Sequence, residues 1–205
     1  MGTPAAPAPL PGGREIFEVR FHGRGGQGVV IASVVLAEAA FLEGRGVQAF
    51  PFFGVERRGA PVVAHTRIGS GEIRLACDVE QPDALIITDP SLVGTVAQGS
   101  LQALRPGGIA LLNSTHRPEV LGLTKPSQGT RIVSFDASSL ARQHGLGSAA
   151  SPIVNTVVLG AFAKLTGLVK WPSLRQAIEE KVPVKREANV AAAQAAFESV
   201  GEVAS

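Results

Sequence analysis

A run of glycines between an apolar strand pattern and an alanine-rich helix pattern constrains this chain more than any other feature. Residues 22–30 read HGRGGQGVV, with four glycines in the six positions from Gly23 to Gly28. Glycine lets the backbone turn sharply and approach a ligand closely. The first turn of the following helix presents unpaired N–H groups and the positive end of the helix dipole. The run therefore predicts an anion-binding turn, and a phosphorylated cofactor is the ligand that we expect there.

Two familiar nucleotide motifs fit this turn incompletely. Gly23, Gly25 and Gly28 have the G-x-G-x-x-G spacing of a dinucleotide fingerprint, which also needs an acidic residue about 20 positions later. Glu43 stands too early for that role and Glu56 too late. No Gly-Lys-Ser or Gly-Lys-Thr follows the glycines, which excludes a Walker-type loop. A tight strand–helix turn that holds no ligand is the alternative interpretation.

Length and composition limit the classes of protein to consider. The 205 residues, 45% hydrophobic and 18% charged, suit one domain with a substantial core. A net charge of +2 with scattered basic residues does not indicate a partner nucleic acid or membrane surface. No apolar run reaches the roughly 18 residues of a membrane helix and nothing resembles a signal peptide, so we expect a cytoplasmic protein. Residues 1–13, rich in Ala, Pro and Gly, are expected to form a flexible tail before a domain over 14–205.

The side chains that perform chemistry in proteins are sparse in this sequence. One cysteine, Cys77, is too few for an iron–sulfur cluster, a zinc site or an internal disulfide within the chain. His65 lies within a predicted strand, where a structural role is expected. His22 lies beside the glycine run, where we expect it to cap the strand end, with a ligand contact as the alternative. No Ser-His-Asp or Cys-His arrangement is indicated by spacing. We therefore expect neither a catalytic residue nor a metal ligand in this chain.

Strand and helix patterns alternate over the first two-thirds of the sequence. Strands are predicted over 15–21, 47–50, 62–68, 84–88, 109–113 and 131–135, with a further short strand over 73–76. Helices are predicted over 29–43, 92–104, 137–144, 153–166, 173–182 and 187–200. Because no helix separates the strands between 47 and 76, we expect an α/β domain whose sheet is mixed.

Several local signals mark the ends and faces of these helices. Val30, Val34, Ala37 and Phe41 give the first helix an apolar stripe at helical spacing. Asp89 and Asp136 are expected to cap the helices that follow them. The pair Ser173 and Gln176 fits a capping box at the start of the helix over 173–182.

Two further segments contain candidate ligand-binding residues. Residues 50–61 read FPFFGVERRGAP, in which Arg57 and Arg58 stand between glycines that allow the backbone to aim a guanidinium at a phosphate or carboxylate. Glu56 is a ready ion-pair partner for one of them, and a loop held by such a pair is the alternative. Asn155 and Thr156 stand at a helix start, where capping is the common role and a ligand contact the alternative.

Three segments taken together resemble one family: HGRGGQGVV at 22–30, FPFFGVERRGAPV at 50–62 and SPIVNTVVLGAFA at 151–163. Over about residues 15–200 the chain is similar to the gamma subunit, or the equivalent domain, of thiamine-diphosphate-dependent 2-oxoacid:acceptor oxidoreductases, typified by pyruvate:ferredoxin oxidoreductase. Phe53-Gly54 followed by residues 56–61 is similar to the branch that acts on pyruvate, branched-chain or aryl 2-oxoacids. Val55 departs from the proline that is common in that branch.

The resemblance implies a complex that decarboxylates a 2-oxoacid on thiamine diphosphate, passes electrons through iron–sulfur clusters and releases an acyl-CoA. This chain lacks the Gly-Asp-Gly…Asn segment that binds Mg²⁺ and diphosphate, so thiamine diphosphate, Mg²⁺ and the clusters are expected in partner subunits. The expected electron acceptor is ferredoxin, or a nicotinamide cofactor served by a further subunit. The family fold implies one domain in which helices flank a mixed sheet that curls toward a barrel.

For the chain itself, the resemblance implies that it shapes the approach to the active site and contacts coenzyme A. The candidate residues are Gly23, Arg24, Gly25, Gly26, Gln27, Gly28, Glu56, Arg57, Arg58, Asn155 and Thr156. Two other interpretations stay open at this point. One is a stand-alone nucleotide-binding oxidoreductase, which the missing ribose-binding acid argues against. The other is a purely structural assembly subunit with an empty glycine turn.

Overall fold

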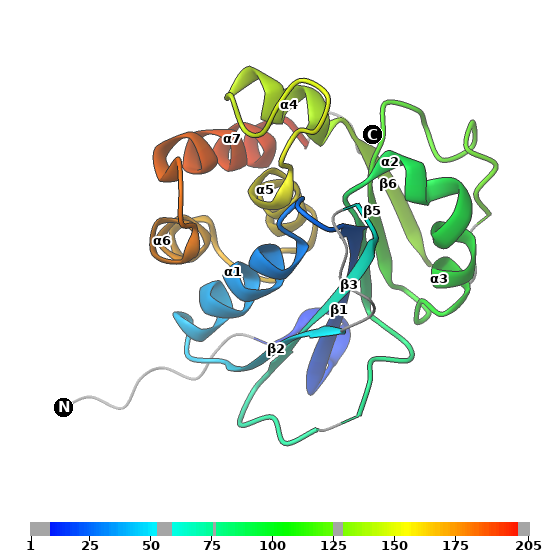
Figure 1. Cartoon of the computed structure of the whole chain (residues 1–205). Helices are drawn as coiled ribbons and strands as arrows, with labels where there is room; N and C mark the ends of the chain where they lie inside the picture. Colours follow the sequence, from blue (N-terminus) through cyan, green and yellow to red (C-terminus); the bar gives the residue numbers. More distant parts are fainter. Residues whose placement is uncertain (1–8, 53–58, 76, 125–128, 201–205) are drawn as a thin grey trace.

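A six-stranded mixed sheet divides the molecule into two unequal layers of helices (Figure 1). The computed structural model describes residues 9–52, 59–75, 77–124 and 129–200. The strands lie in the order β2-β3-β1-β4-β5-β6. Their bounds are β1 (Ile16–Arg24), β2 (Gly46–Phe52), β3 (Pro61–Gly69), β4 (Ala84–Ile87), β5 (Ile109–Asn113) and β6 (Arg131–Phe135).

Strand direction follows from the connections along the chain. Strands β2 and β3 are consecutive in the chain, and β3 runs antiparallel to both β2 and β1. Strands β4, β5 and β6 run parallel to one another and to β1. The predicted mixed sheet is therefore confirmed. In the described part of the chain the sheet stays open, with β2 and β6 at its edges, and the expected curling does not close it into a barrel.

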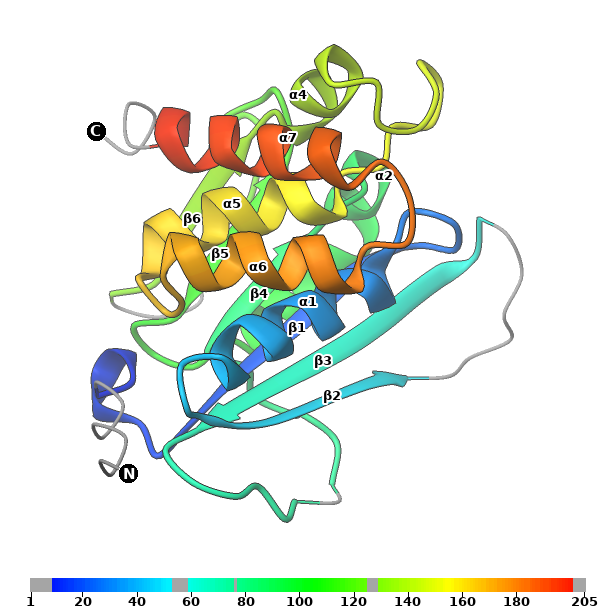
Figure 2. The ribbon, with the colours of Figure 1, turned by 90° about the vertical axis from the view of Figure 1, so that its left-hand side faces the viewer.

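Most of the helices cover one face of the sheet, as Figure 2 shows. These are α1 (Val29–Phe41), α4 (Ala137–Gln143), α5 (Asn155–Thr166), α6 (Trp171–Lys181) and α7 (Arg186–Ser199). The opposite face is covered by a broken helical segment made of α2 (Pro90–Leu92), a π turn η2 (Val93–Ala97) and α3 (Gln98–Gln102). A short 3₁₀ turn, η1 (Pro11–Gly13), precedes β1.

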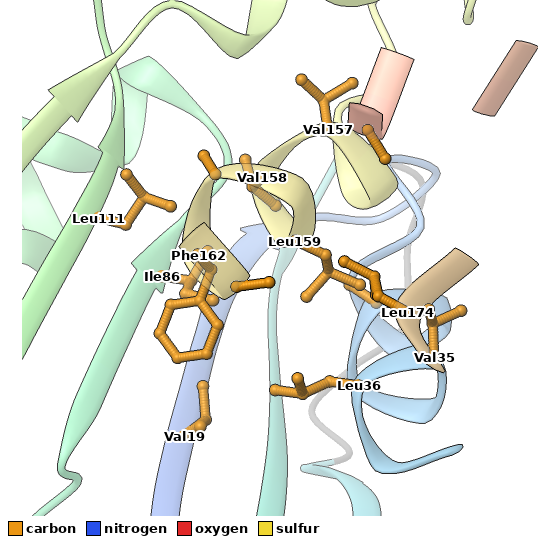
Figure 3. Packing of buried hydrophobic residues seen from close by; sticks show 14 of the residues in the cluster. Val19, Val35, Leu36, Ile86, Leu111, Val157, Val158, Leu159, Phe162 and Leu174 are labelled. Atoms are coloured by element: carbon orange, nitrogen blue, oxygen red, sulfur yellow. The ribbon is translucent and has the colours of Figure 1, made fainter. Parts of the chain in front are cut away.

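Helix α5 occupies the centre of the larger layer, between the sheet and the outer helices (Figure 3). Phe162 and Leu159 of this helix are fully buried, together with Val19 and Ile86 of the sheet and Leu36 of α1. Burial of a large apolar side chain stabilises a fold by about 1.5–3 kcal/mol. This packing holds the first turns of α1 and α5 in fixed positions relative to the sheet.

The chain leaves β1 and its neighbour β4 toward opposite faces of the sheet. Strand β1 leads into α1 on one face, whereas β4 leads into α2 and α3 on the other. In open α/β sheets such a reversal separates the two connections and leaves a crevice at the carboxyl ends of the strands, where ligands bind. The glycine turn lies at this point of the fold.

Several local predictions are wrong. Residues 73–75 form no strand, and the helix predicted over 92–104 is interrupted by the π turn. Helix α6 begins at Trp171 rather than at Ser173, because Pro172 supplies a preorganised first turn and leaves no role for the capping box. Leu10 is buried in the core, and residues 1–8 of the expected tail lie outside the described part. The division into a tail over 1–13 and a domain over 14–205 stays a prediction.

The apolar stripe predicted on α1 is not the face that the helix buries. Val34 is 39% exposed and Phe41 60% exposed. The buried residues of the helix are Val29, Ala32, Ser33, Val35, Leu36, Ala37, Ala39 and Ala40. Because α1 is apolar on nearly every side, periodicity alone does not define its inner face. The predicted caps are confirmed, since Asp89 accepts from Ser91 N and Asp136 from Ser139 N, both at 2.9 Å.

Candidate functional site

A cleft of about 450 Å³ opens at the carboxyl ends of the parallel strands, beside the glycine turn. Arg24 and Gln27 line it from the turn, Thr88 and Asp89 from the end of β4, and Asn113 from the end of β5. Each side chain reaches the cleft because parallel strands end at the same edge of the sheet. The cleft is therefore the place that the fold offers to a ligand.

Close packing requires glycine at both ends of the turn. A Cβ at Gly23 would lie 2.2 Å from Thr88 Oγ1 and 2.3 Å from Val29 Cγ2. Gly28 has φ +77°, and a Cβ there would lie 2.5 Å from Asn155 Nδ2. Gly25 donates its N–H to Ala60 O at 2.9 Å, which fastens the turn to the start of β3. The sequence run thus forms a tight, fixed turn.

The first helical turn of α1 supplies hydrogen-bond donors without acceptors. In the described part of the chain, the N–H groups of Gly28, Val29, Val30 and Ile31 donate to no oxygen, and α1 has no side-chain cap. Four such donors with the positive end of a helix dipole attract an anion or an acceptor group. An anion bound at the glycine run stays a prediction.

Arg24 and Asp89 form the charged part of the cleft. Arg24 Nε lies 3.6 Å from Asp89 Oδ1, and the Arg24 guanidinium also donates to Ser91 Oγ at 2.7 Å and to Gly59 O at 3.0 Å. Gln27 Nε2 donates to Asp89 Oδ2. Burial would raise the pKa of Asp89, but hydrogen bonds from Ser91 and Gln27 and the charge of Arg24 outweigh it and lower that pKa. The carboxylate is therefore ionised and neutralised locally.

Sequence reasoning missed the polar residues that close the far side of the cleft. Asn113, only 2% exposed, donates to Thr88 O at 2.7 Å and to Ser138 Oγ at 2.9 Å, and accepts from Ser138 N at 3.1 Å. Arg142 lines the cleft from α4. The signal that was available is positional. Asp89 directly follows the predicted apolar strand over 84–88, Asn113 ends the next apolar strand, and Ser138 lies in the first turn of the helix after the strand that follows.

Asn155 lies directly behind the glycine turn, and Thr156 lies deeper. The Oδ1 atom of Asn155 accepts from Thr156 N at 2.8 Å, which fixes the orientation of its amide toward Gly28. Thr156 is fully buried and donates its hydroxyl to Asn189 Oδ1 at 2.7 Å. The structure thus places Asn155 next to the glycine run, and the hydrogen bond of Thr156 holds α5 against α7.

Glu56, Arg57 and Arg58, the other candidates, lie outside the described residues. The next residue that the structure describes, Gly59, lines the cleft. Gly59 N donates to Gly25 O at 3.2 Å, so the chain that follows the two arginines returns to the glycine turn.

The two strand histidines belong to a buried polar layer on the α3 side of the sheet. His22 contacts Ser100 Oγ at 3.1 Å, and His65 lies 3.3 Å from Asp78. Burial is the main cause that lowers the pKa of both histidines to about 4, with smaller contributions from neighbouring cations such as Arg20. Both rings are neutral near pH 7, in keeping with the structural role expected of them.

Comparison with known proteins identifies the family. The family model described as "Pyruvate ferredoxin/flavodoxin oxidoreductase" matches residues 18–199. The chain belongs to this family. The match begins at the third residue of β1 and spans the rest of the sheet, the glycine turn and all of α7, so it includes the cleft just described.

Relatives within this family are gamma subunits. The chain is 48% identical to the "Pyruvate/ketoisovalerate oxidoreductases common subunit gamma" of Thermococcus kodakarensis, over 89% of this chain and 96% of the relative. It is 46% identical to the "Pyruvate synthase subunit PorC" of Methanothermobacter marburgensis, over 90% and 98%. The crystal structure of the pyruvate oxidoreductase subunit PORC of Thermotoga maritima superimposes with a TM-score of 0.74 at 34% identity, over 90% of this chain and 97% of that one.

These relationships establish the chain as a gamma subunit of multi-subunit 2-oxoacid:ferredoxin oxidoreductase complexes, which confirms the family and the enzyme class expected from its three motifs. A 2-oxoglutarate:ferredoxin oxidoreductase from Magnetococcus marinus shares the fold, with a TM-score of 0.68 at 21% identity over 93% of this chain and 31% of that one. Within the described ranges, no helix is both long and apolar enough to cross a membrane.

Proposed function

We propose that this gamma subunit binds coenzyme A at the cleft and so delivers the acyl acceptor to a reaction centre built by its partner subunits. The observation that supports this most is the lining of the cleft of about 450 Å³, to which the glycine turn contributes Arg24, Gly25 and Gln27 and α4 contributes Arg142. Arginine guanidinium groups are well suited to phosphate oxygens, which they can bind through two parallel hydrogen bonds. The related 2-oxoglutarate enzyme of Magnetococcus marinus, whose structure has coenzyme A bound, contains the same fold.

The proposed contacts follow the candidate residues. The Gly23–Gly28 turn, with Arg24 and Gln27, receives a phosphate or pyrophosphate, and Arg57 or Arg58 grips it through two parallel hydrogen bonds. Glu56 pairs with the other arginine. We assign to Asn155 a contact beside the turn, and to the buried Thr156 the support of that contact through Asn189.

The redox chemistry is proposed to belong to the partners. Among the described residues no three His, Cys, Asp or Glu side chains are placed to hold a metal ion, and the single Cys77 is too few for a cluster. We therefore assign thiamine diphosphate, Mg²⁺ and the iron–sulfur clusters to other subunits. The acceptor is ferredoxin or an NAD-linked protein, the substrate is pyruvate or a branched-chain or aryl 2-oxoacid, and the location is cytoplasmic.

Single replacement of Arg57 and Arg58 by alanine in the assembled complex tests the coenzyme A proposal. Loss of one charge-assisted hydrogen bond to a phosphate costs about 1.5–3 kcal/mol, which corresponds to roughly a 10-fold to 100-fold rise in the KM for coenzyme A. The KM for the 2-oxoacid should stay unchanged. Arg175→Ala is the matched control, because Arg175 is an exposed arginine that pairs with Glu179 on α6. An unchanged KM for coenzyme A in both variants would refute the proposal.

A further inference from the structure

The wall that α4 contributes to the cleft carries a cation that no acidic side chain neutralises. Arg142 lies in the last turn of α4 and lines the cleft together with Ser138 of the same helix. Residues four positions apart share one face of a helix, so both side chains meet the same space. Figure 1 shows α4 and α2 at the same end of the sheet, which is the end where the cleft opens. The α4 wall is therefore a polar surface separate from the glycine turn.

The charge of the other arginine in the cleft is already compensated. Arg24 Nε lies 3.6 Å from Asp89 Oδ1, and the Arg24 guanidinium also donates to Ser91 Oγ and Gly59 O. Asp89, whose carboxylate is ionised, is the one acidic side chain among the described residues that line the cleft. The charges of Arg24 and Asp89 cancel, which leaves Arg142 as the net positive charge of the cleft.

Arg142 is oriented by neutral acceptors. Its Nε donates to Ala149 O at 3.2 Å, and its Nη1 lies 3.4 Å from Ser139 Oγ. The described residues offer this guanidinium no carboxylate, and its Nη2 donates to none of their oxygens. A guanidinium has five N–H donors in a planar fork, so most of them are left for a ligand.

A short closed loop fixes the carbonyl that holds Arg142. A β-bridge between Gly147 and Pro152 closes this loop. Gly147 has φ +79°, and a Cβ there would lie 2.4 Å from Ser151 O, so the closure requires glycine. The loop also lines the cleft through Ser151 and Pro152. Because Ala149 O belongs to this loop, the guanidinium of Arg142 is held at the wall of the cleft.

Ser138 adds a hydroxyl whose proton is available to a ligand. Asn113 Nδ2 donates to Ser138 Oγ at 2.9 Å and to Thr88 O at 2.7 Å, and Asn113 Oδ1 accepts from Ser138 N at 3.1 Å. Thr88 O can only accept and Ser138 N can only donate, so these bonds fix the orientation of the Asn113 amide. The Ser138 oxygen therefore accepts, and its proton has no acceptor among the described residues. A fixed guanidinium and a hydroxyl donor thus lie on one face of α4.

These two donors suit a phosphate that is separate from the one at the glycine turn. Coenzyme A carries phosphate at two places, the pyrophosphate that joins pantetheine to adenosine and a monoester at the 3′ position of the ribose. A phosphate monoester has close to two negative charges at pH 7 and accepts two parallel hydrogen bonds from a guanidinium. We propose that Arg142 and Ser138 bind the 3′-phosphate, so that the subunit selects coenzyme A over 3′-dephospho-coenzyme A. This selectivity rests on the proposed function, because it gives the second phosphate of the same ligand a position in the same cleft.

Steady-state kinetics of the assembled complex with two acyl acceptors tests the contact. 3′-Dephospho-coenzyme A lacks only the group that Arg142 and Ser138 bind, so its KM should exceed that of coenzyme A by roughly 10-fold to 100-fold. Arg142→Ala should raise the KM for coenzyme A by about the same factor and leave the KM for 3′-dephospho-coenzyme A within about 2-fold. An equal rise in both KM values, or no change in either, would overturn the assignment.

Three further variants separate a ligand contact from a structural role. Arg142→Lys keeps the charge without the planar fork and should retain part of the selectivity for coenzyme A. Ser138→Ala removes the hydroxyl and should lower that selectivity by at least about 3-fold. Gln143→Ala is the matched control, because Gln143 is exposed on the same helix and does not line the cleft. Full selectivity in Ser138→Ala, or loss of selectivity in Gln143→Ala, would contradict the contact.

Direct binding provides a measurement that does not need turnover. Adenosine 3′,5′-bisphosphate carries the 3′-phosphate, and adenosine 5′-monophosphate lacks it. In isothermal titration calorimetry without a 2-oxoacid, the complex should bind the bisphosphate at least about 10-fold more tightly, and Arg142→Gln should remove the difference. Glutamine keeps an N–H donor for Ala149 O, so this variant also serves if Arg142→Ala fails to fold. Equal binding of the two nucleotides by the unaltered complex would refute the assignment.

The outcomes distinguish this contact from coenzyme A binding as a whole. If Arg57→Ala or Arg58→Ala raises the KM for both acceptors and Arg142→Ala raises neither, the subunit binds coenzyme A and the 3′-phosphate assignment is wrong. If neither those variants nor Arg142→Ala changes either KM, coenzyme A binding at the cleft is wrong as well.

Discussion

The contact between Gly28 and Asn155 makes a quantitative prediction about the glycine turn. An alanine at Gly28 must keep φ near +77°, which costs about 1–2 kcal/mol for a residue with a Cβ. Its Cβ would also lie 2.5 Å from Asn155 Nδ2, well inside van der Waals contact. Overpacking of this kind costs about 1–3 kcal/mol. We expect Gly28→Ala to lower the free energy of unfolding by about 2–5 kcal/mol.

Gly26→Ala separates the two contributions. Gly26 has φ +95°, but a Cβ there would meet nothing within 4 Å, so only the backbone strain applies. The difference between the two variants therefore measures the contact with Asn155, and it should amount to about 1–3 kcal/mol. In an Asn155→Ala background the amide is absent, and Gly28→Ala should then cost no more than Gly26→Ala.

Urea unfolding of the purified chain measures these differences. Trp171 is the only tryptophan, and its ring lies 5.6 Å from that of Phe197 between centroids in a tilted arrangement, so its fluorescence reports the packing of α6 on α7. Far-ultraviolet circular dichroism gives a second probe of the same transition. If Gly28→Ala destabilises the chain no more than Gly26→Ala, the contact does not hold the turn and the geometric reasoning is wrong.

Two further predictions concern packing and pH. A Cβ at Gly160 would lie 2.0 Å from Ala193 O, so Gly160→Ala should force α5 and α7 apart and destabilise the chain by about 1–3 kcal/mol in urea unfolding. Gly99→Ala, where a Cβ meets nothing within 4 Å, should be neutral or slightly stabilising, and the same result at Gly160 would contradict the helix contact. For His22 and His65 the folded pKa is about 4, below the unfolded value of about 6.5, so the unfolded chain binds more protons between these limits. The free energy of unfolding should therefore fall as the pH decreases through that window, by about 2 kcal/mol per histidine between pH 7.5 and 5. A His22→Asn, His65→Asn double variant should lose this pH dependence. An unchanged dependence of the unfolding free energy on pH in that variant would refute the prediction.

Local sequence signals predicted the positions of the helices and strands better than which face of each helix is buried. The strands that follow Asp83 and Gly108, and the caps at Asp89 and Asp136, are local features, because they depend on neighbouring residues only. The buried face of α1 is a tertiary property. Val34 and Ala37 are both apolar, and only the positions of the sheet, α5 and α6 decide which of them is covered.

The candidate site was predicted in part for the same reason. The glycine run predicts the turn locally, because Gly26 and Gly28 themselves adopt the positive φ angles that the turn requires. Asp89, Asn113 and Ser138 were missed as a group because they are separated by 24 and 25 positions and meet only when parallel strands are placed side by side.

The sequence by itself determined the family, the mixed α/β class and the position of the anion-receptive turn, because each depends on short stretches of residues with strong local preferences. Only the tertiary structure decided what surrounds that turn. The first turn of α5 meets both the glycine turn and α7 because α5 packs against α1 and α7 packs against α5, and the residue pattern of a single helix does not specify these neighbours. Long-range packing fixes which polar groups share a cavity, and the chemistry that we propose for this subunit depends on that sharing.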